Sequence, residues 1–132
     1  MPFVVLITVW RKPGMDPQAF YEHYENVHMP LIRDLAGDVI PISHNRLYVA
    51  RPGTGPDYPE RMVQEAECGD GISYDAVAEL VFENEAHNLA YWKVLYKGPD
   101  QGQRLTEDEY KFMDRSKLRI VAMDKKELMI RK

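Results

Sequence analysis

The feature that most restricts how this chain can fold is its first apolar run, residues 3–10. The run reads Phe-Val-Val-Leu-Ile-Thr-Val-Trp, in which β-branched and aromatic side chains predominate and Thr8 alone is polar. Successive side chains of a β-strand point to opposite faces of the sheet, so a strand without polar alternation needs cover on both faces. We therefore expect a strand in a sheet that is covered on both sides, ended by the turn at residues 12–14.

The remaining elements follow from turn signals and from the spacing of apolar residues. Asp16 and Pro17 are typical of a helix start, and apolar residues between 20 and 35 recur at spacings of three and four. Pro30 should kink or interrupt this helix, and Gly37 should end it. The later elements are expected as strands at 44–51, 74–82 and 117–123 and as helices at 85–96 and 106–113, the last one opened by a capping box at 106–109.

This order, β-α-β-β-α-(α)-β, predicts an α+β fold of the ferredoxin-like βαββαβ type, with an antiparallel sheet and helices on one face. The face without helices needs another cover, and a second copy of the same sheet is the simplest one, so we expect a homodimer. The 132 residues should form one domain, 1–132, in which 52–73 is a long loop or lid insert. Residues 61–68 could form two helical turns within that insert.

Composition and missing motifs exclude several classes of protein. The net charge of −4 and the scattered basic residues argue against a nucleic-acid partner. The run 3–10 is too short to span a membrane and has no signal-peptide features, so we expect a cytoplasmic protein. Cys68 is the one cysteine and no zinc spacing or Gly-rich phosphate loop occurs, so we expect neither a metal nor an organic cofactor.

The first helix holds the main candidate for chemistry. At helical spacing Tyr21, Tyr24 and His28 share one face, and a histidine among tyrosines on a half-buried face can act as a general acid or base near neutral pH. The alternative is a histidine that caps a kinked helix end. His23 lies about 140° from His28 at roughly 100° per residue, so we expect it to face solvent.

Other polar residues remain open between a functional and a structural role. His44, Arg46 and Tyr48 form a row on one face of a strand, which lines a pocket if it faces the helices and has no role if it faces solvent. The pair His87 and Tyr91 is expected at a surface or rim. Capping and the helix dipole explain Glu107 and Glu109, whereas Asp108 is less well explained.

Two segments carry a resemblance to a known family. Residues 12–31, with Pro-Gly, a short spacer, Phe-Tyr and then His-x-Pro-Leu, resemble the entry motif of the EthD family. Residues 106–121 are similar to the corresponding run of fungal members in polyketide pathways of secondary metabolism, among them decarboxylases of anthraquinone-type carboxylic acids. The resemblance implies a dimeric α/β barrel, a pocket between sheet and helices, and lyase, cyclase or isomerase chemistry without a cofactor. It carries the family histidine over to His28.

We therefore expect a lyase, a decarboxylase of an aromatic polyketide-type acid. His28 would donate the proton, and Tyr24 is the second expected catalytic residue. Tyr24 or Tyr48 would orient phenolic oxygens. Arg46 or His44 would hold the carboxylate. The other expected substrate-binding residues are Tyr21 and Asp108. The alternatives are a cyclase, dehydratase or isomerase on a similar polyketide, a non-catalytic protein that binds a small metabolite, or a stress-type dimer of structural role.

Overall fold

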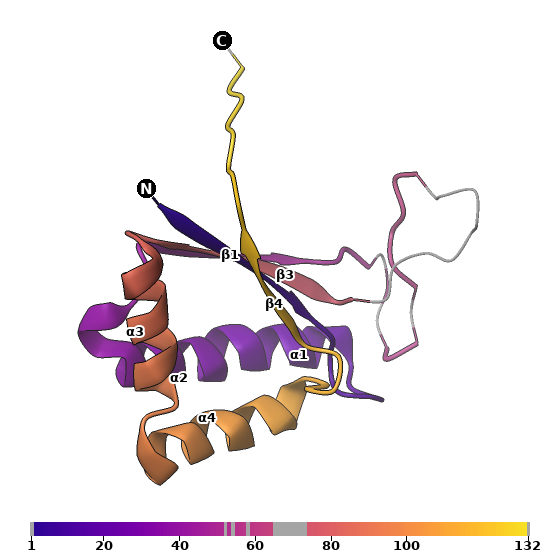
Figure 1. Ribbon diagram of the computed structural model, residues 1–132. Helices are drawn as coiled ribbons and strands as arrows, with labels where there is room; N and C mark the ends of the chain where they lie inside the picture. The colour runs from indigo at the N-terminus through magenta and orange to yellow at the C-terminus, as the bar shows by residue number, and fades with distance from the viewer. Residues whose placement is uncertain (1, 52, 54, 58, 65–73, 132) are drawn as a thin grey trace.

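A single four-stranded antiparallel sheet forms the centre of the protein (Figure 1). The computed structural model describes residues 2–51, 53, 55–57, 59–64 and 74–131. The strands lie in the order β2-β3-β1-β4. Their bounds are Phe3–Val9 for β1, Ser43–Tyr48 for β2, Ala76–Phe82 for β3 and Arg119–Met123 for β4. The first apolar run is thus an inner strand, paired with β3 on one side and β4 on the other.

The α-helices of the described residues all lie on one side of this sheet (Figure 1). They are α1 at Pro17–His23, α2 at Met29–Ala36, α3 at Glu85–Leu95 and α4 at Gly98–Phe112, with a π-helical turn η1 at Tyr24–His28 and a 3-10 turn η2 at Gly37–Val39. Asp16 caps α1 as expected, because its carboxylate accepts a hydrogen bond from the Gln18 amide at 2.8 Å. None of the described helices is long and apolar enough to cross a bilayer.

The core fills the space between the sheet and the helices. Alternate residues of β1, Val5, Ile7 and Val9, point into it, and large side chains such as Phe20 and Phe112 from the helices pack against them. The two rings lie 5.8 Å apart between centroids. This layer buries one half of the apolar run at 3–10.

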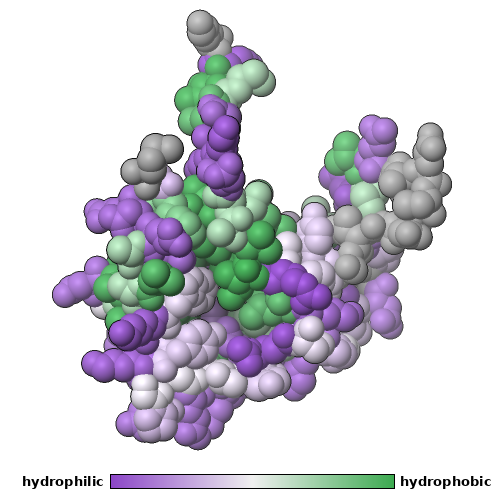
Figure 2. Space-filling view, in the orientation of Figure 1, coloured by the Kyte–Doolittle hydropathy of each residue, from purple (hydrophilic) through white to green (hydrophobic). Residues whose placement is uncertain are grey.

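The other half of the run lies on the open face, which we define as the side of the sheet away from the helices. By strand alternation Val4 and Leu6 lie there, opposite Met123 and Val121 of β4. Figure 2 shows hydrophobic side chains gathered over β4, where Val121 is 50% exposed. Within one chain, therefore, none of the described helices covers the second apolar face of β1.

The start of the last helix differs from the expectation. α4 begins at Gly98 and not at 106, so the capping box expected at 106–109 is wrong: Thr106 lies inside the helix. The Gly-Pro pair ends one helix and begins the next, because Gly98 adopts φ +63° and Pro99 fits the first turn of α4. The lid expected at 52–73 falls largely outside the described residues, and 61–64 are not helical.

Candidate active site

The π-helical turn brings two histidines of the first helical segment onto one face. In η1 the Met29 amide donates to the Tyr24 carbonyl, a bond across five residues instead of four. Residues five apart therefore lie above one another, as His23 and His28 do. The expectation that His23 lies on a different face is wrong, because it assumed α-helical rotation throughout.

Both imidazoles bind the same carboxylate, that of Asp108 on α4. His28 Nδ1 donates to Asp108 Oδ2 at 2.9 Å, and His23 Nε2 donates to Asp108 Oδ1 at 2.8 Å. Asp108 and His28 are each 5% exposed. Burial by itself would raise the pKa of Asp108, but the hydrogen bonds from the two histidines outweigh it and lower that pKa. Asp108 is therefore an anion that fixes both rings.

The bond to Asp108 determines what His28 can do. Because Nδ1 donates to the carboxylate, Nε2 is the nitrogen left for chemistry, and it forms no hydrogen bond within the described residues. Tyr24 packs edge-on against the imidazole with ring centroids 5.5 Å apart. Burial raises the pKa of Tyr24, so its hydroxyl keeps its proton near neutral pH. A histidine oriented by a carboxylate is the arrangement used for general acid–base catalysis.

His28 lines a small cavity of about 30 Å³ between the sheet and the helices. Most of the lining is apolar, and the charged or titratable members are few. The lining residues are Ile7, Val9, Tyr24, His28, Ile32, His44, Tyr91, Trp92, Leu95, Leu105, Glu109, Met113, Leu118 and Ile120. A space this small has room for only a few water molecules, so the cavity admits a larger ligand only if side chains move.

Glu109 is a site residue that the sequence reasoning missed. Its carboxylate lines the same cavity as His28, is 6% exposed, and lies 3.1 Å from Arg115 Nε. Burial raises the pKa of Glu109 despite that arginine. The capping box appeared to explain this residue. Its spacing from Leu105 and Phe112, four and three positions, was the signal that it lies on the buried stripe of α4.

The strand row at 44–48 faces the helices, but only one of its members reaches the His28 cavity. His44 lines it. Arg46 and Tyr48 bind Glu25 instead, at 2.6 Å from Arg46 Nε and 2.5 Å from the Tyr48 hydroxyl to the same carboxylate oxygen. Tyr21 also lies apart from this cavity. It is 43% exposed, and its ring centroid is 4.8 Å from that of Tyr48. Of the expected residues, Tyr24, His28 and His44 are thus brought together, with Asp108 behind His28.

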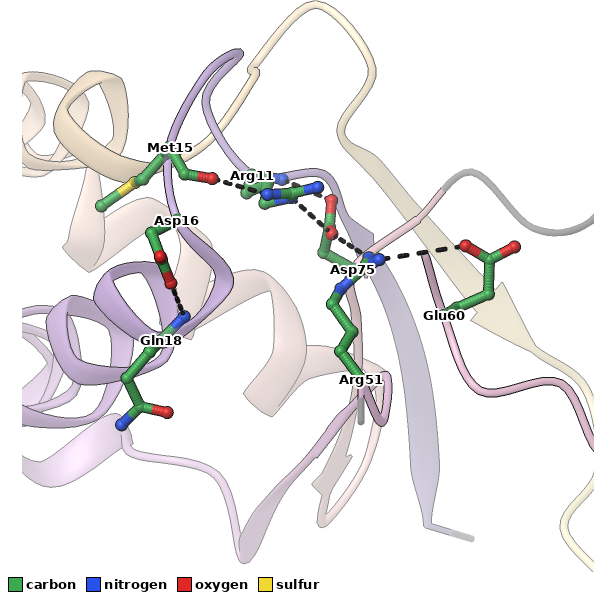
Figure 3. A network of polar contacts seen from close by, with 7 residues as sticks. All are labelled: Arg11, Met15, Asp16, Gln18, Arg51, Glu60 and Asp75. Atoms are coloured by element: carbon green, nitrogen blue, oxygen red, sulfur yellow. Dashed lines mark hydrogen bonds and ion pairs between the residues drawn. The ribbon is translucent and has the colours of Figure 1, made fainter. Parts of the chain in front are cut away.

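A second polar network joins the ends of the strands (Figure 3). The Asp75 carboxylate accepts hydrogen bonds from Arg11 Nε at 2.9 Å and from Arg51 Nη2 at 2.6 Å. Arg11 also reaches the Met15 carbonyl. None of these residues lines the His28 cavity. The network fastens the segments after β1 and β2 to the one before β3, which is a structural role.

His87 also has a structural role. Its Nε2 donates to the Val39 carbonyl at 2.9 Å, and its Nδ1 accepts from the Glu83 amide at 3.1 Å. It is thus fixed by backbone groups and does not line the cavity, whereas Tyr91 does. Within the part of the chain that the structure describes, no group of three or more His, Cys, Asp or Glu side chains is placed to hold a metal ion.

Comparison with known proteins identifies related domains. Residues 12–116 match the EthD domain. An EthD family protein from Bacillus halodurans C-125 has a similar structure, with a TM-score of 0.55 and 21% identity, over 94% of this chain and 99% of that one. An EthD-like protein from Ralstonia eutropha JMP134 has a TM-score of 0.52 and 10% identity, over 93% and 89%. At these identities the two structures establish the fold alone. No curated protein sequence matches the chain.

Proposed function

The chain belongs to the EthD domain family, and on this premise we propose that it is a cofactor-free acid–base lyase that decarboxylates an aromatic polyketide-type carboxylic acid. The observation that carries the proposal is the orientation of His28: Asp108 binds its Nδ1 at 2.9 Å, and the ring lines an apolar cavity. A buried imidazole with one nitrogen held by a carboxylate can give or take a proton at the other.

The proposed step uses one proton and no redox partner. Protonated His28 donates from Nε2 to the ring carbon that bears the carboxylate. The bond between that carbon and the carboxylate then breaks, its electron pair restores the aromatic ring, and carbon dioxide leaves. Neutral His28 regains a proton from water. The Asp108 anion stabilises the imidazolium that donates, as a carboxylate does for histidine in other hydrolytic and proton-transfer sites.

The lining of the cavity favours loss of a carboxylate. No lysine or arginine is among the described lining residues. Arg46, expected to hold the carboxylate, is occupied by the two oxygens of Glu25 at 2.6 and 2.8 Å. A carboxylate moved from water into this site would lose hydration without gaining a guanidinium partner, which raises its free energy relative to neutral carbon dioxide.

We further propose that the fold is of the ferredoxin-like type and that two copies form a dimeric α/β barrel. The strand order β2-β3-β1-β4 and the βαββαβ succession support the first part. The open face supports the second, because Leu6 and Val121 lie side by side on it without a covering helix. Contiguous exposed apolar patches commonly mark protein interfaces.

Turnover of hydroxylated aromatic carboxylic acids tests the function. A panel of such acids is screened for carbon dioxide release, and His28→Ala is compared with wild type on each acid that reacts. Removal of a general acid lowers a rate by about 10²- to 10⁴-fold. His87→Gln is the matched control, because it also replaces a hydrogen-bonded histidine, but one that lies away from the cavity. Wild-type turnover by His28→Ala would refute the mechanism.

A second reaction class has its own observation. Glu109 and His28 line one cavity, and burial raises the pKa of Glu109 above its ordinary value. Two proton carriers in one site suit an isomerase, cyclase or dehydratase that removes a proton at one atom and returns it at another. In the same screen such an enzyme would change the absorbance spectrum without release of carbon dioxide. Binding without either change would indicate a metabolite-binding protein.

A further inference from the structure

A groove of about 680 Å³ lies on the outer side of the His28 cavity. It runs between the helical segment at Glu25–Arg33 and the chain from Ile40 to Arg46. Its volume is within the usual range of small-molecule sites, about 300–1,000 Å³, whereas the cavity of about 30 Å³ is not. Two side chains, Ile32 and His44, line both spaces. They form the partition between the groove and the imidazole of His28.

His44 differs from the other histidines of the chain in its hydrogen bonding. Both of its ring nitrogens are buried and have no partner within the described residues. His23, His28 and His87 each have at least one ring nitrogen in a hydrogen bond. A buried polar atom without a partner costs free energy and is uncommon, so it points to a ligand that completes it.

We propose that this groove binds the aromatic body of the substrate and that His44 determines specificity by a hydrogen bond to an uncharged phenolic hydroxyl or keto oxygen. This proposal rests on the proposed function for the reaction that follows, but not for binding. A ligand that displaces Ile32 and bonds to His44 would bring its ring to His28 Nε2.

The charges around His44 favour a ligand whose oxygen at this position is uncharged. Burial, with Arg46 and His28 nearby, lowers the pKa of His44 to about 4, so the ring is neutral near pH 7. The Glu25 carboxylate acts in the opposite direction and raises this pKa, but it is paired with Arg46. A neutral imidazole offers one donor and one acceptor and no charge. That matches a hydroxyl or keto group, and it revises the expectation that His44 holds the carboxylate.

A pair of fluorescent acids that differ by one hydroxyl tests this inference: 1-hydroxy-2-naphthoic acid and 2-naphthoic acid. Fluorescence titration of the full chain gives both dissociation constants. We expect wild type to prefer the hydroxylated acid by roughly 2- to 10-fold, the usual effect of one neutral hydrogen bond. His44→Phe keeps a planar ring without nitrogens and should bind both acids equally. His44→Gln restores a donor and an acceptor and should recover part of the preference.

Two further variants locate the site and guard against misfolding. Ile42→Trp adds bulk to the groove at a residue that does not line the cavity. It should weaken the binding of both acids at least several-fold. His87→Gln should leave both constants unchanged. Circular dichroism of each variant confirms the fold, and His44→Gln keeps the test valid if His44→Phe fails to fold.

Each outcome separates this inference from the proposed function. An unchanged preference in His44→Phe, or an absence of binding of either acid to wild type up to millimolar concentration, overturns the inference. Loss of the preference in His44→Phe when no aromatic acid is turned over by wild type supports the inference and counts against the decarboxylase. If turnover requires His28 but the preference for the hydroxylated acid persists without His44, the result supports the decarboxylase and overturns the inference.

Discussion

His28 follows His23 by one π-helical turn, and the two imidazoles bind opposite oxygens of one carboxylate, at 2.9 and 2.8 Å. That carboxylate, Asp108, comes from α4, the helix furthest along the chain. The pairing joins the first helical segment to the last one. It also makes Asp108 a positioning residue, because its hydrogen bond to Nδ1 determines which nitrogen of His28 is free for chemistry.

His23→Ala should have a modest effect on both stability and turnover. Asp108 then loses one of its two donors, which should lower the free energy of unfolding by about 1 kcal/mol. Turnover should fall less than about 10-fold, since His28 keeps its own bond to Asp108. Urea denaturation and turnover of the same preparation measure the two effects. A loss of turnover as large as that of His28→Ala would mean that His23 itself transfers the proton.

Asp108→Asn should remove most activity with little change in shape. The amide cannot stabilise an imidazolium as an anion does, so we expect turnover to fall by roughly 10²- to 10⁴-fold. The neighbouring Glu107 is exposed and forms its hydrogen bond only with Gln103, so Glu107→Gln is the control and should be silent. An active Asp108→Asn enzyme would show that the carboxylate is structural only.

The same variant should change the acid limb of stability. The pKa of Asp108 is lowered in the folded protein, so its contribution is present above the pKa of the unfolded chain, near 4, and is lost as pH falls through the folded value. Asp108→Asn lacks this titration. Its free energy of unfolding, measured by denaturation from pH 6 to pH 2, should therefore depend less steeply on pH than that of wild type below about pH 4.

The sequence predicted the regular elements well because burial repeats at the period of the element. The runs at 3–10, 74–82 and 85–96 correspond to β1, β3 and α3 within one or two residues. His28, Tyr24 and His44 were selected by residue type and face, and the structure brings all three to one cavity. Local patterns were sufficient there because each of these residues lies on the face of its own element that points into the protein.

The predictions failed where the helix departs from the α-helical period, where one motif is compatible with two structures, or where a contact joins two elements. Pro30 predicted an interruption of the helix. A rotation of about 100° per residue, which assumes an α-helix, could not show that the interruption is a π-helical turn that aligns His23 with His28. The Gly98-Pro99 pair was expected only to end a helix, but it also begins the helix α4. Arg46 was expected to be free for substrate, and its pairing with Glu25 depends on contact between two elements, which one strand cannot reveal.

Glu109→Gln should stabilise the protein at neutral pH. Burial raises the pKa of Glu109, so the folded state holds its proton more tightly than the unfolded chain does. Stability is then full below the unfolded pKa of about 4.5 and declines as pH rises through the folded value. The neutral amide removes this decline, and Tm at pH 7.5 should rise by a few degrees. An equal Tm rise at pH 4 and pH 7.5 would exclude a titration effect.

Val121→Lys should separate the proposed dimer into monomers. Val121 lies beside Leu6 on the open face and is 50% exposed in the single chain, so a second sheet packed there would bury it. A buried lysine without a partner costs several kcal/mol, enough to dissociate an interface of ordinary affinity. Sedimentation at micromolar concentration should give about 31 kDa for wild type, twice the chain mass of 15.4 kDa, and 15.4 kDa for the variant. Ala19→Lys, at an exposed position of α1 on the helical side, is the control and should leave the mass unchanged. A wild-type protein that sediments only at 15.4 kDa would refute the dimer, and the open face would then need another partner.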